Sequence, residues 1–333
     1  MPFSLEEISL LLCCPDDRAA LAACPNGLRC ERCHRFYPLL SQNILELLPS
    51  RPIIFPDKSE LGPYRDGYVR EFFRPPEIRV GAKAWGAPEA RSSKWLQLRE
   101  RQTREVLQFL GAGQAGAASV FCDLSAGAGH CTFRAAKEYR LVFHCDLSMD
   151  ALAYAGAKAS AMRLENIVFV HADYFQPPFW NSVHHLICLD TLIRGAWHEA
   201  KLLQSIQSAL TPRGAAVVDF HNWWHNPLRR LGFLPDNFVG NKSYTRGELT
   251  SLLSISGIEE FDTRPFVQEV DPRGAPGKLL ARFIPATRLM VRLAGADAAL
   301  THTASDRQQE GMACEPWFSG LLLRNDLRAE SDE

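Results

Sequence analysis

Glycines and acidic side chains gather in one stretch of the chain, residues 118–146, with the sequence ASVFCDLSAGAGHCTFRAAKEYRLVFHCD. Asp123 precedes a turn that contains Gly127 and Gly129, and a second acid, Asp146, follows the next apolar run. Glycines let a ligand approach the backbone closely, and a helix that starts at the turn offers free N–H groups. A carboxylate after the second apolar run can accept hydrogen bonds from ribose hydroxyls. The spacing therefore predicts a site for a nucleotide-like ligand.

Short apolar runs and amphipathic segments alternate around this stretch and would position its residues. We expect a strand, a glycine turn, a helix and a second strand within residues 118–146. Similar patterns continue on both sides and predict an α/β fold with a mainly parallel sheet. The predicted strands are 120–124, 141–145, 166–170, 185–190, 215–220 and 258–270, and the predicted helices include 92–110, 148–162 and 199–210.

The spacing of the glycines indicates which nucleotide-like ligand the turn would bind. A dinucleotide site would show G-x-G-x-x-G directly after the strand, whereas residues 123–129 read D-L-S-A-G-A-G. This turn resembles the D-x-G-x-G-x-G motif of class I S-adenosylmethionine-dependent methyltransferases, with Ser125 at the first glycine position. If that position needs a positive φ, a serine there is strained. A complete G-x-G-x-x-G occurs at residues 111–116, but it precedes the first strand, and we interpret it as a linker that ends a helix.

The resemblance covers about residues 92–270 and implies a Rossmann-like, doubly wound sheet that binds S-adenosylmethionine. It implies that Gly127 and Gly129 approach the methionine part and that Asp146 binds the ribose. It further implies that Asp173 binds adenine, and that Asp123 stabilises the turn or reaches the amino group through water. The predicted cofactor-binding residues are Asp123, Ser125, Gly127, Gly129, Asp146, Leu147, Ala172, Asp173 and Asp190.

Two histidines, His221 and His225, flank a pair of tryptophans after the predicted strand 215–220. An imidazole at this edge of the sheet can remove a proton from a methyl acceptor, so both are candidate catalytic residues. Alternatively, they cap the strand and pack under the following loop. Many small-molecule methyltransferases carry histidines just after the fourth strand, but residues 191–194 here read T-L-I-R.

Five of the ten cysteines lie within the first 33 residues. Cys30 and Cys33 have the C-x-x-C spacing that lets two thiolates bind one tetrahedral zinc ion, and Cys14 and Asp17 repeat this spacing with aspartate in the last place. With the Tyr-Pro pair that follows, the pattern resembles Trm112-like zinc-ribbon segments. The resemblance predicts such a segment over residues 1–50. The predicted metal ligands are Cys14, Asp17, Cys30 and Cys33.

Two alternatives to this metal site stay open. Another side chain can replace Asp17 as the fourth ligand, the candidates being Cys13, Cys24 and His34. The segment can also be a metal-free remnant that a small apolar core holds together.

The remaining segments complete the predicted organisation. Proline-rich residues after the first segment predict a linker over 51–91 whose aromatic side chains, including Tyr68 and Trp85, serve as a cofactor lid or cover the edge of the sheet. The methyltransferase domain is expected over 92–300. Residues 301–333 are predicted to be a C-terminal extension with a charged, disordered end.

Composition limits the partners that we expect. The chain has 333 residues, 23% of them charged, and a formal net charge of −1, so no basic excess favours nucleic acid. No apolar run reaches the roughly 18 residues of a membrane span, and the N-terminus lacks the basic start of a signal peptide, which predicts a cytoplasmic location. We therefore expect a small-molecule acceptor rather than RNA, although ribosomal RNA guanine methyltransferases also join a zinc knuckle to this fold. A non-catalytic scaffold is a further alternative, and the glycine spacing disfavours an NAD-dependent oxidoreductase.

Overall fold

The structure is a computed structural model. It describes residues 3–40, 43–51, 93–111, 119–192, 199–221, 244, 246–258, 261–266 and 318–324. Within the described helices and strands, only the backbone of some residues is described, Asp190 and His221 among them. The predicted lid, His225 and the charged end of the chain lie outside the described residues.

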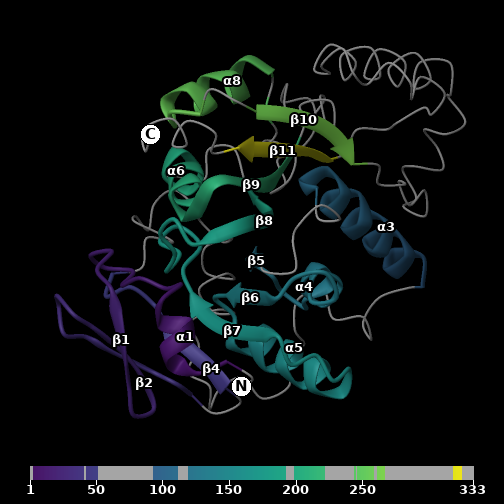
Figure 1. Cartoon of the computed structure of the whole chain (residues 1–333). Helices are drawn as coiled ribbons and strands as arrows, with labels where there is room; N and C mark the ends of the chain where they lie inside the picture. The colour runs from purple at the N-terminus through teal and green to yellow at the C-terminus, as the bar shows by residue number, and fades with distance from the viewer. Residues whose placement is uncertain are drawn as a thin grey trace, which may run out of the picture.

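An eight-stranded sheet forms the centre of the molecule (Figure 1). Its strands, in spatial order, are β10 (Phe261–Phe266), β11 (Phe318–Arg324), β9 (Leu210–His221), β8 (Val183–Leu192), β5 (Val120–Leu124), β6 (Leu141–Asp146), β7 (Ile167–Ala172) and β4 (Ile44–Leu47). β11 pairs antiparallel with both of its neighbours, and the pairs from β9 to β4 are all parallel. Because β6 and β7 follow β5 on one side and β8 and β9 on the other, the order reverses at β5, where open α/β sheets bind ligands. The arrangement confirms the predicted Rossmann-like α/β fold.

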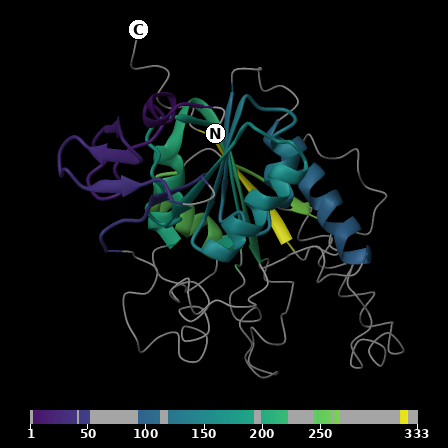
Figure 2. The same ribbon diagram turned by 90° about the horizontal axis from the view of Figure 1, so that it is seen from below.

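Helices cover both faces of this sheet (Figure 2). One apolar cluster joins α3 (Ser93–Leu110), α4 (His130–Ala135) and α5 (Met149–Ala161) to the face that carries Phe121 of β5. The other cluster joins α6 (Glu199–Ala209) and α8 (Arg246–Ile255) to the face that carries Val120 and Cys122. Successive strand residues point to opposite faces, so the buried run in β5 serves both layers. In the described part of the chain, no helix is long and apolar enough to span a membrane.

The N-terminal segment forms a second, smaller sheet. It consists of the antiparallel strands β1 (Leu21–Cys24), β2 (Gly27–Cys30) and β3 (Phe36–Pro38), preceded by α1 (Leu5–Ser9). Ser4 and Glu7 cap α1 reciprocally in a capping box. The backbone N–H of Cys13 donates to the carbonyl of Pro178 at 2.9 Å, so the small sheet is anchored to the loop after β7.

Two edges of the main sheet differ from the pattern expected from the sequence. β4 lies within the segment predicted over residues 1–50, yet it pairs in parallel with β7, with Ile44 opposite Phe169. β11 lies within the predicted C-terminal extension, 301–333, but it inserts between β9 and β10. The central sheet therefore recruits strands from near both ends of the sequence.

Candidate active site

The turn between β5 and α4 has a left-handed backbone at three positions. Ser125, Gly127 and Gly129 have φ values of 66°, 55° and 80°. The first glycine position of the motif therefore does need a positive φ, which costs a non-glycine residue about 1–2 kcal/mol. A Cβ at Gly129 would lie 2.8 Å from Cζ of Phe133, so a side chain at this position requires the Phe133 ring to move.

Asp146 connects this turn to the start of α5. Its Oδ2 accepts a hydrogen bond from the Gly127 N–H at 2.7 Å, and its Oδ1 accepts one from the Ser148 N–H at 2.8 Å. Ser148 in turn caps α5 by accepting from the N–H of Ala151. A carboxylate can accept about four hydrogen bonds, so these two are compatible with further bonds from ribose hydroxyls.

Asp173 lies at the carboxyl end of β7 and is fully buried. Its Oδ1 accepts from the N–H of Phe175 at 2.9 Å, which fixes the loop that leaves the sheet. The neighbouring predicted residues Leu147 and Ala172 are also buried. His171, which precedes Ala172, has its Nε2 3.1 Å from the carbonyl oxygen of Leu147 and so connects β7 to the end of β6. The structure thus brings the predicted residues of β6 and β7 together at one edge of the sheet.

The side chain of Asp123 belongs to a buried polar network next to the turn. The hydroxyl of Thr132 donates to its Oδ2 at 2.6 Å, and the same hydroxyl lies 2.8 Å from Nδ1 of His144. Burial raises the pKa of Asp123 to about 7, helped by the charge of Asp146 and opposed by the hydrogen bonds from Thr132. Burial also lowers the pKa of His144 to about 3. Thr132 and His144 were not predicted as site residues, although a histidine inside an apolar strand is a signal visible in the sequence.

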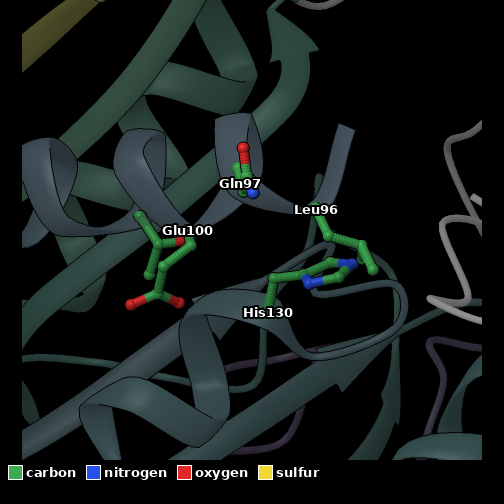
Figure 3. A pocket seen from close by; sticks show the side chains of 5 residues that line it. Leu96, Gln97, Glu100 and His130 are labelled. Carbon is green, nitrogen blue, oxygen red and sulfur yellow. The ribbon is translucent and has the colours of Figure 1, made fainter. Parts of the chain in front are cut away.

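A cavity of about 370 Å³ lies between α3 and the start of α4. Figure 3 shows the ring of His130 next to Leu96, with Gln97 and Glu100 nearby on α3. Thr103 completes the lining. Because His130 directly follows Gly129, the cavity adjoins the glycine turn, and its volume suits a small ligand.

Three predicted residues are not placed as side chains. Asp190 lies in β8 and His221 ends β9, and for both the structure describes the backbone alone. His225 lies outside the described residues. The catalytic assignment of the two histidines therefore stays a prediction.

The four predicted metal ligands come together in the N-terminal segment. One ligand atom from each of Cys14, Asp17, Cys30 and Cys33 lies within 4.8 Å of all the others. The Sγ atoms of Cys14 and Cys33 are 3.7 Å apart, and the Sγ of Cys30 is 3.5 Å from Oδ1 of Asp17. A tetrahedral zinc ion with Zn–S bonds of about 2.3 Å places two sulfur atoms about 3.8 Å apart, so the geometry fits zinc.

The surroundings of these thiols also suit a metal site. The backbone N–H groups of Arg32 and Cys33 point at the Sγ of Cys30, at 3.4 and 3.3 Å, and Tyr37 Oη lies 3.1 Å from the Sγ of Cys14. Hydrogen bonds of this kind orient metal ligands. Among the described residues, the group that can hold a metal includes Asp17 and none of the three alternative fourth ligands, which are Cys13, Cys24 and His34.

Comparisons with known proteins bear on the central part of the chain. Residues 121–214 match the sequence model of a family described as a methyltransferase domain. No curated protein matches this chain in sequence. The match does not extend to residues 1–50, so the Trm112-like segment stays a prediction.

Three solved structures are similar to this chain at low sequence identity. A [4+2]-cyclase is 17% identical with a TM-score of 0.45, covering 74% of this chain and 86% of that chain. Magnesium protoporphyrin IX methyltransferase from Synechocystis PCC 6803 with bound SAH is 18% identical with a TM-score of 0.42, covering 52% and 78%. Phosphoethanolamine N-methyltransferase 2 from Haemonchus contortus, in complex with S-adenosyl-L-methionine, is 17% identical with a TM-score of 0.43, covering 67% and 52%. The family match spans the glycine turn and the strands beside it, and residues 121–214 of this chain are therefore similar to a methyltransferase domain.

Proposed function

We propose that this chain is an S-adenosylmethionine-dependent methyltransferase that acts on a small-molecule acceptor. One observation carries the proposal: the family match coincides with the positive-φ turn at Ser125, Gly127 and Gly129, which Asp146 ties to the start of α5. A turn of this kind, at the reversal point of the strand order, is where a nucleotide-like ligand binds in an open α/β sheet.

The residues of the site would bind and orient the cofactor. When bound, S-adenosylmethionine supplies a methyl group that its sulfonium already activates, so the protein mainly has to align the acceptor. The backbone at Gly127 and Gly129 would approach the methionine part, and Asp146 would accept from the ribose hydroxyls. Asp173 and its apolar neighbours at the end of β7 bind adenine, and the carboxylate of Asp123 attracts the ammonium group.

The acceptor would enter through the cavity between α3 and α4. Its volume of about 370 Å³ suits a small molecule, and its lining adjoins the turn through His130. The formal net charge of −1 supplies no overall basic field for RNA. His221 and His225 remain candidates for removing a proton from the acceptor. RNA methylation and a non-catalytic binding role are the alternatives, and transfer of a labelled methyl group to RNA, or to neither RNA nor small molecules, would distinguish them.

Zinc at the N-terminal segment is part of the same proposal. Cys14, Asp17, Cys30 and Cys33 would hold it, and the separations between their ligand atoms support this assignment. The ion would stabilise the small sheet as in a Trm112-like segment, because it would join the loop at Cys14 and Asp17 to the loop at Cys30 and Cys33. Thiolates persist in a reducing compartment, which supports the predicted cytoplasmic location.

Isothermal titration with S-adenosylhomocysteine tests the cofactor site. We expect the wild-type protein to bind, and Asp146→Asn to bind at least about tenfold more weakly, because the amide cannot accept from ribose and from both backbone N–H groups. Glu165→Gln is the matched control, since it makes the same carboxylate-to-amide change at an exposed position. Absence of binding by the wild type would refute the proposed function, and unchanged affinity in Asp146→Asn would refute the site.

A further inference from the structure

Three buried polar side chains form a chain of contacts directly below the glycine turn. Asp123 comes from β5, Thr132 from α4 and His144 from β6, and at most 4% of each is exposed. The Thr132 hydroxyl contacts Asp123 Oδ2 at 2.6 Å and His144 Nδ1 at 2.8 Å. The ring of His144 also packs on Phe169, with 5.3 Å between ring centroids, which fixes its orientation.

The protons on Asp123, Thr132 and His144 allow two hydrogen-bonding arrangements. Thr132 has a single hydroxyl proton, so it can donate to Asp123 or to His144, but not to both. When Asp123 is ionised, Thr132 donates to it and accepts from Nδ1–H of a neutral His144. When Asp123 is protonated, it donates to Thr132, Thr132 donates to Nδ1, and the ring proton of His144 lies on Nε2.

The two arrangements differ by one proton, which leaves from Nε2 while the imidazole stays neutral. Among the described residues, Nε2 of His144 has no hydrogen-bond partner, so a bare nitrogen is buried when Asp123 is ionised. The backbone of Gly127 partly offsets the effect of burial on the pKa of His144, so the ring lies near the glycine turn.

We propose that Thr132 and His144 are positioning residues that prepare Asp123 for the cationic end of the cofactor and couple cofactor binding to the release of one proton. The inference rests on the proposed function, because an ammonium group next to the turn is what favours the ionised arrangement. On binding, the Asp123 proton moves to Thr132, the Thr132 hydroxyl proton moves to Nδ1 of His144, and the proton on Nε2 is the one that the protein loses.

The titratable groups around Asp123 favour its protonated form as long as no cation is bound. Desolvation keeps the carboxyl protonated to about pH 7, and the charge of Asp146 on β6 acts in the same direction. Burial raises the pKa of Cys131 on α4, and the charge of Asp123 raises it further, so Cys131 stays a neutral thiol. His144 is likewise neutral between pH 6 and pH 8, because burial lowers its pKa to about 3. Among the described residues, none of the groups that shift the pKa of Asp123 is a cation, so an ammonium group would compensate this negative charge directly.

Titration calorimetry of the whole protein with S-adenosylhomocysteine tests the inference across pH 5.5 to 8.5. Each titration is repeated in two buffers with different ionisation enthalpies, which gives the number of protons released. For the wild type we expect the affinity to fall about tenfold per pH unit below about pH 7, with net proton release on binding in that range.

Variants of Thr132 and His144 show whether these residues position Asp123 or only stabilise the fold, because only the first role affects the midpoint of the pH profile. Thr132→Val removes the hydroxyl while keeping its shape, so the midpoint of the pH profile should move up by about one unit or more, and Thr132→Ser should restore it. His144→Leu should shift the midpoint in the same direction, and His144→Asn, whose amide can donate to Thr132, should restore it. Ser205→Ala, which removes another buried hydroxyl on α6, should leave the midpoint unchanged.

The possible outcomes are distinct. Wild-type binding without pH dependence or proton release overturns the inference and leaves the proposed function intact. A Thr132→Val protein that unfolds at a lower temperature but keeps the wild-type midpoint also overturns it, because only structural support was lost. If the wild type does not bind S-adenosylhomocysteine at all, the proposed function itself has failed.

Discussion

Replacing Asp123 by asparagine removes a buried ionisable group and keeps its size and its acceptor for Thr132. In the folded protein the pKa of Asp123 is raised by burial to about 7, whereas its ordinary value is 3.8. Between these two values the folded state binds a proton that the unfolded state has lost, so the contribution of Asp123 to stability falls as the pH rises. The asparagine variant has no such proton and escapes this loss.

The size of the effect follows from the two values of the pKa. A difference from 3.8 to about 7, at about 1.4 kcal/mol per pKa unit, corresponds to about 4 kcal/mol in total, of which about 3 kcal/mol develops between pH 5 and pH 8. His144 acts in the opposite direction: its pKa is lowered to about 3, so its contribution rises with pH up to its ordinary value of 6.5. The informative quantity is therefore the difference between Asp123→Asn and the wild type, in which the contribution of His144 largely cancels.

Urea unfolding of both proteins at pH 5 and pH 8 measures this difference. We expect the free energy of unfolding of Asp123→Asn, relative to the wild type, to increase by about 3 kcal/mol from the lower to the higher pH. Glu165→Gln, the exposed control, should show no such change. A difference that stays constant between the two pH values would refute the assignment of Asp123 as a buried, protonated carboxyl.

Three further predictions concern the turn and the metal site. Ser125→Gly should raise the free energy of unfolding by about 1 kcal/mol in urea, since glycine adopts a φ of 66° without strain; a decrease would contradict the left-handed assignment. Gly129→Ala should weaken S-adenosylhomocysteine binding, because a φ of 80° strains alanine and its Cβ would displace the ring of Phe133 at the turn. Gly111→Ala, with a φ of 79° and no atom within 4 Å, should cost only stability, and equal binding by both variants would contradict this. Asp17→Cys should tighten zinc binding in competition with a chelator and Asp17→Ala should weaken it, whereas equal affinities would exclude Asp17 as a ligand.

The local features of the site could be predicted because they depend on neighbours in the sequence. The strand, turn, helix and strand around Gly127 occupy 27 consecutive residues in the structure, Val120 to Asp146, and their signals are local apolar runs and glycines. The C-x-x-C spacing of Cys30 and Cys33 is also local, and only the approach of Cys14 and Asp17 required the fold. The positive φ at Ser125 was predictable as a requirement of the motif, not from the serine itself.

Features that depend on distant partners could not be predicted. β11 is a short run whose partners, β9 and β10, lie far away in the sequence, so nothing near Phe318 indicates an inner strand. β4 likewise joins β7 across more than a hundred residues. His144 looks like an ordinary strand residue until α4 brings the Thr132 hydroxyl to within 2.8 Å of its ring. Contacts between residues far apart in the sequence determine the positions of β11 and β4 and the role of His144.

The most direct test of the proposed function is transfer of a labelled methyl group. The wild-type protein and Asp146→Asn are incubated with S-adenosylmethionine that carries the label on its methyl group, together with either a metabolite extract or total RNA. The proposal predicts that the wild type labels the small-molecule fraction and that Asp146→Asn labels it far less. Label only in RNA would contradict the proposed substrate class, and no transfer to either fraction, despite cofactor binding, would contradict the proposal that the chain is an active methyltransferase.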